Sequence, residues 1–232
     1  KKILGQFIIT GLTFAFICKY GVINKTLDFS IVNPLIKGSF LYITPVLFFI
    51  FMLFVIIGSS NAVNLTDGLD GLVSGPIIVV SVTLLIITYL TGHYEYAKYL
   101  NLYYVRESAE ITVYLASVIG ALIGFLWYNF YPAQMFMGDT GSMALGGAVC
   151  AVAISMNMHL IIIMVGLIYL IESLSVIIQV TAYKRFKKRV FKMSPFHHHL
   201  ELSGYKETKV VGIFCIVTAI MSVISILSTQ FI

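Results

Sequence analysis

Residues 40–58, FLYITPVLFFIFMLFVIIG, decide the fold, because this stretch contains no charged residue and is long enough to cross a bilayer as a helix. At about 1.5 Å rise per residue, roughly 20 apolar residues span the hydrocarbon core. Six other stretches are also apolar and nearly as long or longer, and the fifth of the seven in chain order is the shortest. The seven predicted spans are residues 3–23, 40–58, 72–92, 111–128, 142–157, 160–183 and 209–231.

The composition of the whole chain agrees with a membrane protein. Of its 232 residues, 59% are hydrophobic and 11% are charged, and the mean hydropathy is +0.96, whereas an ordinary soluble domain carries about a quarter charged residues. Backbone groups in lipid must be paired internally, and the runs lack the alternation of barrel strands. We therefore predict an all-α integral membrane protein, a bundle of about seven transmembrane helices that forms one domain over residues 1–232.

The positive charges predict how the chain is oriented. Cytoplasmic loops of membrane proteins carry an excess of Lys and Arg. The segment between the sixth and seventh predicted spans holds eight of the 15 positive residues, and Lys1 and Lys2 fall on the same side. This gives ten positive residues inside against five outside, the five being Lys19, Lys25, Lys37, Lys98 and Arg106. The polar segments 59–71, 129–141 and 184–208 are then all cytoplasmic, and any active site should lie there.

The first of these segments contains NAVNLTDGLDG at residues 61–71. If its second half is helical, Asp67 and Asp70 share one face, with Asn64 one step before them. Capping of a helix end is the simpler interpretation, because Asx and Thr are favoured there. A carboxylate at the end of a membrane helix is costly, however, and this favours a function for the pair.

The second segment leads from Asn129 to PAQMFMGDTGS at residues 132–142. Asp139 follows a glycine immediately before an apolar helix, where free N–H groups and the positive helix end favour anions. A carboxylate there could also hold Mg²⁺, which takes most of its ligands from water and substrate phosphate. The alternative is an ordinary helix N-cap.

The third segment begins with a basic run from Lys184 to Lys192. Phe186, Val190 and Met193 are spaced as on one face of a helix, which is typical of a helix lying on anionic headgroups. Nucleic-acid binding is disfavoured so close to a bilayer. The run His197-His198-His199 follows, and three consecutive histidines cannot all point at one metal. They are better suited to general acid–base work or phosphate binding by one or two of them.

Glu172 lies in the middle of the sixth predicted span, and Ser175 and Gln179 follow on the same helix face. An acidic residue inside the membrane suggests a proton or ion pathway. Hydrogen bonding between helices is the competing interpretation, and one polar stripe does not separate the two.

The three polar segments together resemble the phospho-N-acetylmuramoyl-pentapeptide transferase family, within the superfamily of polyprenyl-phosphate sugar-1-phosphate transferases. The resemblance runs along the whole chain and rests on three motifs. They are NAVNLTDGLDG at 61–71, PAQMFMGDTGS at 132–142 with the Gly146-Gly147 pair, and MSPFHHHLE at 193–201. The histidine motif resembles this family in particular, whereas the acidic motifs are similar across the superfamily.

The resemblance implies transfer of phospho-MurNAc-pentapeptide from UDP-MurNAc-pentapeptide to undecaprenyl phosphate, which gives lipid I and UMP and requires Mg²⁺. It implies Asp139 as the metal ligand and a catalytic residue, together with Asp67, His197 and His198. It also implies a set of substrate-binding residues, with Phe136 stacking on uracil: Asn64, Gly68, Leu69, Asp70, Asn129, Phe136 and His199. Phosphoryl transfer depends mainly on positioning and charge neutralisation, which a metal, a helix end and polar side chains can supply.

The implied location is the bacterial inner membrane, with the active site on the cytoplasmic face and a homodimer as one compatible assembly. Members of the family carry an Asp-Asp-x-x-Lys motif in an earlier loop, and this sequence contains no adjacent acidic pair. The resemblance therefore implies a part of the enzyme that lacks the first three of ten helices, inactive on its own. The alternatives are a related HexNAc-1-phosphate transferase and a transporter that uses Glu172.

Overall fold

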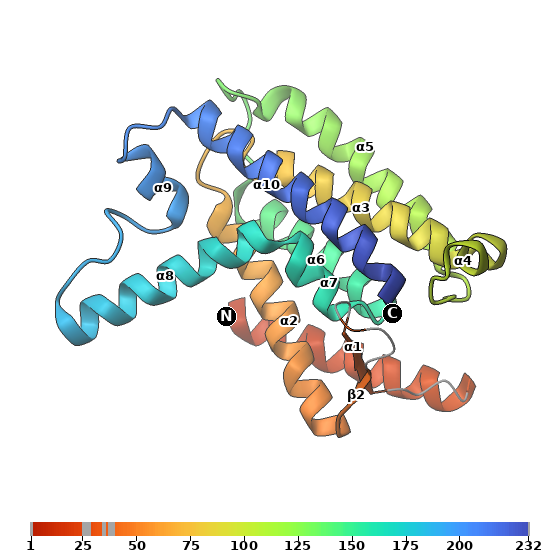
Figure 1. The fold of residues 1–232 in the computed structure, drawn as a ribbon. Helices are drawn as coiled ribbons and strands as arrows, with labels where there is room; N and C mark the ends of the chain where they lie inside the picture. The colour runs from red at the N-terminus through yellow and green to blue at the C-terminus, as the bar shows by residue number, and fades with distance from the viewer. Residues whose placement is uncertain (1, 25–28, 34–35, 37–39, 232) are drawn as a thin grey trace.

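A computed structural model describes residues 2–24, 29–33, 36 and 40–231 of the chain (Figure 1). Helices dominate this part, which confirms the predicted all-α class. A small antiparallel pair of strands, β1 (Ser30–Val32) and β2 (Phe40–Tyr42), is the one departure among the described residues. The described helices are α1 (Lys2–Asn24), α2 (Pro45–Thr66), α3 (Ser74–Gly92), α4 (Tyr94–Leu100), α5 (Ile111–Asn129), α6 (Gly138–Ser155), α7 (His159–Val165), α8 (Leu167–Phe186), α9 (Phe196–Glu201) and α10 (Glu207–Ser228), with 3-10 turns η1 (Ser108–Glu110) and η2 (Thr229–Phe231).

Within the described residues, six helices are long and apolar enough to cross a membrane: α1, α2, α3, α5, α8 and α10. The predicted span 142–157 forms α6, which is not among the six. Its composition is rich in Gly, Ala and Ser, because α6 packs tightly inside the bundle where small residues let helix backbones approach. Three of the positive residues used to predict the orientation, Lys1, Lys25 and Lys37, lie outside the described residues.

The contact between α2 and α6 builds the centre of the molecule. The Ser59 hydroxyl donates to the Gly146 carbonyl at 3.0 Å, and the Ser60 hydroxyl donates to the Met143 carbonyl at 3.1 Å. A Cβ atom at Gly146 would approach the Ser59 carbonyl oxygen to 2.7 Å, so glycine is required for this close packing. The helices run antiparallel, because the end of α2 meets the start of α6 and Phe48 near the start of α2 meets His159 beyond the end of α6.

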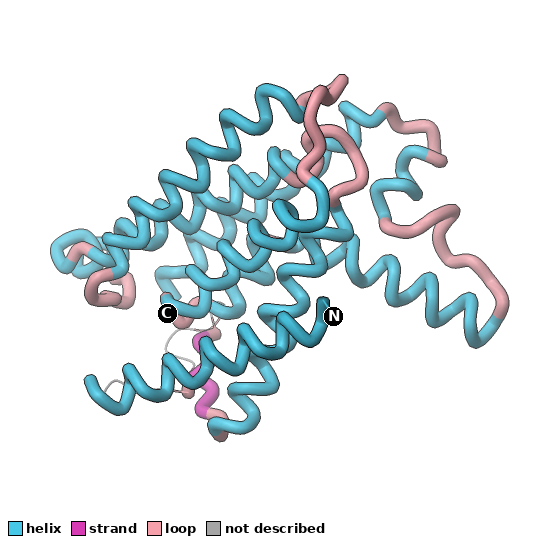
Figure 2. The backbone as a smooth tube through the Cα atoms, turned by 180° about the vertical axis from the view of Figure 1, so that it is seen from behind, coloured by secondary structure: helices cyan, strands magenta, loops and turns pink. Residues whose placement is uncertain are grey.

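The chain from 160 to 183 does not form the single span that we predicted. It breaks at Gly166 into α7 and α8, and a Cβ atom there would meet the Ile162 carbonyl oxygen at 2.7 Å. In both views α8 leaves the direction of α3 and α10 and extends away from the bundle (Figures 1 and 2). Glu172 is consequently not midway through a span. Its carboxylate bonds to His197, which contacts Gly68 just beyond the end of α2.

Two predicted helical stretches end or begin differently. The span predicted from residue 40 starts as strand β2, and the helix begins at Pro45, because Pro is suited to the first helical turn and the Thr44 hydroxyl accepts a hydrogen bond from Leu47 N at 3.4 Å. The predicted surface helix through Val190 and Met193 is wrong. Helix α8 ends at Phe186, since Lys187 adopts a left-handed conformation with φ 52°, and an irregular segment follows.

Candidate active site

The end of α2, the start of α6 and the start of α10 meet at one end of the bundle, which we call the site end. Helix α2 stops at Thr66, and the chain turns through residues 67–73 into α3. Gly71 has φ 75°, a backbone conformation that favours glycine. The backbone N–H of Asp70 donates to the Glu207 carboxylate of α10 at 2.7 Å, and the Asp70 carboxylate accepts from Ala133 N at 2.8 Å. Asp70 therefore connects the turn after α2 with the start of α10 and with the loop before α6.

Asn129 holds the 130–137 loop in place. Its side chain is 5% exposed, its Oδ1 accepts from the Ser74 hydroxyl at 2.9 Å, and its Nδ2 donates to the Met135 carbonyl at 2.9 Å. Both ends of the amide are thus used within the protein. Phe136, in the same loop, is 77% exposed and packs into no core, so its ring is free to stack on a planar ligand.

A polar cluster lies where α2 meets α6, and we call Lys2, Asn64, Asp67 and Asp139 the Asp139 cluster. Asn64 Nδ2 donates to Asp139 Oδ1 at 2.8 Å and lies 2.9 Å from the Ser142 hydroxyl. Lys2 Nζ donates to Asp139 Oδ2 at 3.1 Å and to Asn64 Oδ1 at 2.8 Å. The Asp139 side chain is 77% exposed, so a ligand can reach its carboxylate.

The two carboxylates of the Asp139 cluster differ in their acidity. Hydrogen bonds from Asn64 and Lys2, with the charge of Lys2, lower the pKa of Asp139. Partial burial and the nearby charge of Asp139 raise the pKa of Asp67, against the effect of a backbone hydrogen bond at Gly138. Like charges in one cluster disfavour ionisation of both, which is the effect of Asp139 on Asp67. A cation between them would relieve that repulsion.

The donor set at Asp139 fits Mg²⁺ as proteins usually bind it. The described residues contain no group of three His, Cys, Asp or Glu side chains that could hold a metal. Mg²⁺ is commonly bound through one or two carboxylates, with its remaining oxygens from water and substrate phosphate. An exposed Asp139 beside Asp67 matches that requirement, whereas a fully enclosed protein site would not be expected here.

The three histidines of α9 have three different environments. His197 is 1% exposed, with Nδ1 3.1 Å from the Glu172 carboxylate and its ring against Gly68. The side chain of His198 is 30% exposed, with Nδ1 2.7 Å from Glu201 Oε2. His199 stacks on Phe196, and its Nδ1 accepts from Lys192 N at 3.2 Å. Of the three, His198 combines access to solvent with a carboxylate partner that leaves Nε2 available.

Sequence reasoning did not assign Lys2, Glu207 or Gln179 to the site. Gln179 bonds through its amide to the backbone of Val190 and Phe191 at 2.9 to 3.0 Å, and so holds the segment before the histidines. Gln179 and Glu172 belong to the same polar stripe on α8. The stripe is visible in the sequence. The partners of Gln179 could not be predicted, because they lie in the segment after α8, for which the spacing of Phe186, Val190 and Met193 wrongly predicted a helix.

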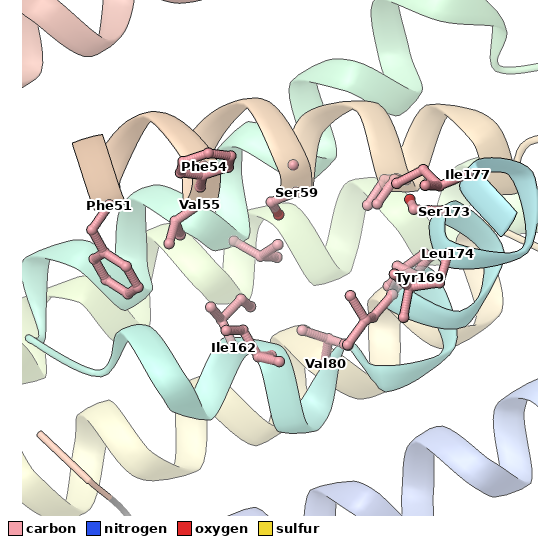
Figure 3. Close-up of a pocket in the computed structure, with 17 residues that line it drawn as sticks. Phe51, Phe54, Val55, Ser59, Val80, Ile162, Tyr169, Ser173, Leu174 and Ile177 are labelled. Atoms are coloured by element: carbon pink, nitrogen blue, oxygen red, sulfur yellow. The ribbon is translucent and has the colours of Figure 1, made fainter. Parts of the chain in front are cut away.

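An apolar groove of about 370 Å³ is lined mainly by residues of α2, α7 and α8 (Figure 3). It lies between α2 and the α7–α8 break, with single residues from α3 and α6. Its lining is almost entirely apolar and includes Phe51, Phe54, Val55, Ala62, Ile162, Tyr169, Leu174 and Ile177. Ala62 and Val63 of the groove immediately precede Asn64 in α2, and Asp67 follows four residues after Val63. An apolar chain in the groove would therefore bring its polar end near the Asp139 cluster.

Comparison with known proteins places the chain in a family. Phospho-N-acetylmuramoyl-pentapeptide-transferases are similar to it: that of Fusobacterium nucleatum is 45% identical over 97% of this chain and 63% of its own length. The one from Endomicrobium trichonymphae is 42% identical over 99% of this chain and 63% of its own length, and that of Neisseria meningitidis is 41% identical over 94% and 59%. The chain thus spans about three fifths of these relatives. Residues 1–157 match the model of glycosyl transferase family 4, and the chain therefore belongs to that family.

Proposed function

We propose that the protein transfers phospho-MurNAc-pentapeptide from its UDP carrier to undecaprenyl phosphate, releasing UMP, as the names of its relatives suggest. The observation that carries this proposal is the convergence of the three motifs at the site end through the Asp139–Asn64 and Asp70–Ala133 contacts and the packing of His197 on Gly68. In the reaction, an oxygen of the lipid phosphate bonds to the phosphorus that carries the sugar. The bond from that phosphorus to UMP breaks.

Asp139 would hold Mg²⁺ beside the diphosphate, with Asp67 as the second carboxylate of the same cluster. The metal neutralises charge on the phosphate oxygens when bound. Asn64 orients Asp139 through the 2.8 Å hydrogen bond and presents its amide to the same space. The Lys2 ammonium group could leave Asp139 and bind a phosphate oxygen of the substrate instead, because the Lys2 and Asp139 side chains are both accessible.

The turn Gly68-Leu69-Asp70 would bind the uridine, with Phe136 stacking on the base. The exposed ring of Phe136 supports this role, since a large aromatic side chain in water gains from a planar partner. Asp70 keeps the turn in place through Glu207 and Ala133. Asn129 supports the 130–137 loop from within, and His199 is held by Phe196 and Lys192.

The apolar groove would take the isoprenoid chain of the acceptor. Its apolar lining is compatible with an isoprenoid chain that enters from the membrane, and two of its lining residues, Ala62 and Val63, directly precede Asn64 of the Asp139 cluster. His198 would meet the phosphate or sugar from the opposite side, with Glu201 orienting its ring. The acceptor phosphate then reaches the diphosphate without leaving the membrane.

We infer that the site end faces the cytoplasm, with the protein in the bacterial inner membrane. The ten-to-five distribution of Lys and Arg supports this orientation. Single cysteines introduced at positions 67, 139 and 198 should be labelled by an impermeant thiol reagent only from the cytoplasmic side. Labelling of any one of them from the outside would contradict a single cytoplasmic active site. Homodimer formation is a further prediction, which cross-linking in the native membrane would test.

The activity is tested by supplying the part that the relatives have beyond this chain. Residues 1–232 should be expressed alone and together with the N-terminal part of the Fusobacterium nucleatum relative, and Mg²⁺-dependent UMP release measured with UDP-MurNAc-pentapeptide. We expect release only on co-expression, because lost acid–base and metal ligands cost about 10²–10⁴-fold. Release with a UDP-HexNAc lacking the peptide would instead indicate the related HexNAc-1-phosphate transferase. No release with either substrate would refute the proposal.

The transporter alternative has lost the feature that suggested it. Both carboxylate oxygens of Glu172 are engaged by His197, so neither is left to bind a transported ion or proton carrier. The remaining polar residues of the α8 stripe bond to nearby backbone. We therefore keep the transferase as the one proposed function.

A further inference from the structure

Glu172 is the most completely buried carboxylate at the site end, and both of its oxygens bind the same residue. The side chain is 0% exposed. Oε1 accepts a hydrogen bond from the His197 backbone N–H at 3.0 Å, and Oε2 lies 3.1 Å from the His197 ring Nδ1. A buried carboxylate that meets the backbone and the ring of one residue restricts that residue in both position and orientation.

This arrangement favours a proton on one particular nitrogen of the His197 ring. With the backbone N–H donating to Oε1, an Nδ1–H would donate to Oε2 and satisfy both carboxylate oxygens, and we assign the ring proton to Nδ1 on this ground. Nε2 is then turned away from Glu172, is buried, and has no hydrogen-bond partner among the residues that the structure describes. A Cβ atom added at Gly68 would overlap with Nε2. The Nε2 edge of the His197 ring is therefore in close contact with Gly68, the first residue of the Gly68-Leu69-Asp70 turn.

The Glu172 contact holds the start of helix α9. It has only six residues, and no side chain caps its start at Pro195. Apolar contacts of Phe196 and Leu200 with a small cluster around Leu72 and Phe214 hold one side of it. Apolar contacts alone would let the helix shift along its neighbours. The two hydrogen bonds between His197 and the Glu172 carboxylate are directional, so they fix the position of the helix start. His198, the next residue, takes its direction from the same backbone.

We propose that Glu172 is a positioning residue for substrate binding: it holds His197 in the Nδ1-protonated tautomer against Gly68 and thereby fixes the nucleotide-binding turn and the direction of His198. The inference rests on the proposed function, because the turn is taken to bind the UDP carrier. Glu172 contacts no substrate in this arrangement, and His197 acts between it and the turn.

The main test replaces Glu172 by Gln in the co-expressed, active protein. Gln keeps the shape of Glu but offers an N–H₂ donor to Nδ1, so the ring should carry its proton on Nε2 instead. In ¹⁵N-histidine-labelled protein, the NMR signals of His197, assigned by their loss in His197→Ala, should report this exchange of tautomer. We expect UDP affinity to fall by about tenfold to 100-fold, with a rise in KM larger than the fall in kcat.

The matched control is Glu95→Gln, which makes the same change at an exposed position on α4, far from the site end. It should leave the histidine signals, UDP affinity and KM at their wild-type values. A purely structural role for Glu172 would lower the thermal midpoint of Glu172→Gln without changing the tautomer or separating KM from kcat. Unchanged tautomer or unchanged UDP affinity in a folded Glu172→Gln protein would overturn the inference.

A second pair of variants keeps the inference testable if Glu172→Gln does not fold. Gly68→Ala should weaken UDP binding at least tenfold when the His197 ring is present, because the new Cβ atom and Nε2 cannot occupy the same space. In a His197→Ala background the same change should have a much smaller effect, a coupling that a double-mutant cycle measures. Additive effects would refute the contact. Absent UMP release in the wild-type protein would count against the proposed function, whereas an active wild type with additive variants would refute only the role of Glu172.

Discussion

The two carboxylates Asp139 and Glu172 lie at the same end of the molecule in opposite settings. Asp139 is 77% exposed and shares its oxygens between Asn64 and a lysine. Glu172 is 0% exposed and both of its oxygens bind His197. An exposed carboxylate can exchange its partners for a metal or a phosphate at little cost. A buried one is committed to its partner, because leaving that partner unpaired costs the full desolvation penalty. The first is therefore suited to chemistry and the second to position.

The largest expected effect separates the two carboxylates by stability. Glu172→Ala leaves the buried backbone N–H and ring nitrogen of His197 without an acceptor and should lower the free energy of unfolding by about 3–5 kcal/mol. Asp139→Ala should leave the unfolding midpoint unchanged, because that side chain is exposed. Denaturant unfolding of both variants in the same detergent micelle measures the difference. Equal midpoints would show that the comparison between a structural and a chemical carboxylate is wrong.

The second prediction compares the variants by activity, measured as UMP release, instead of by stability. Asp139→Asn keeps the shape of the side chain and removes the charge that would hold Mg²⁺, so UMP release by the co-expressed protein should fall about 10²–10³-fold. Its thermal midpoint should match the wild type. Glu107→Gln, which alters an exposed carboxylate paired with Arg106 outside the site end, is the control and should retain full release. Comparable losses in the two variants would remove Asp139 from the proposed metal site.

Two exposed phenylalanines of the segment between α5 and α6 test whether exposure of a ring is enough for it to bind the nucleotide. Phe136 is 77% exposed and Phe130 is 60% exposed. Phe136→Ala should remove a base-stacking contact of about 1–3 kcal/mol and weaken UDP-sugar affinity about tenfold or more. Phe130→Ala should leave the affinity unchanged, since exposure alone gives no ligand contact. Titration calorimetry with UDP compares them, and equal losses would assign the effect to the loop in general.

The smallest expected effect concerns the pKa of Asp67. Burial and the charge of Asp139 raise this pKa, so Asp139→Asn should lower it toward the usual range while the effect of burial stays. Carboxylate ¹³C NMR titration measures the change. Because the pKa is raised in the folded protein, the associated stability is present below the usual Asp range and is lost as the pH rises through the raised pKa.

The same pKa determines how Mg²⁺ binding responds to pH. On the proposal that Asp67 is the second carboxylate at the metal, Mg²⁺ would bind its ionised form, so the Mg²⁺ affinity should increase as the pH rises through the raised pKa, with release of protons on binding. An affinity that is independent of pH across that range would show that Asp67 does not face the metal.

The sequence alone determined where most of the long helices lie and which polar segments share one end of the molecule. Apolar runs such as 45–66 and 111–129 can lie in lipid only as helices, because their backbone groups must bond internally. The charge distribution and the alternation of spans then bring residues 64–71 and 129–139 to the same end. Asp139, Asn64 and Asp70 could be identified as candidate site residues for this reason, since each stands at or near a helix end with a polar neighbour.

Only the tertiary structure decided what each polar group does. The sequence predicts one span over residues 160–183 with Glu172 at its middle, because a count of apolar residues does not reveal that Gly166 breaks the helix where the Ile162 carbonyl leaves no room for a side chain. Glu172 instead lies near the start of α8. The three consecutive histidines are equivalent in the sequence. They became different when His197 packed on Gly68 while His198 stayed accessible. Contacts between residues far apart in the chain distinguish these groups, and local spacing carries no information about such contacts.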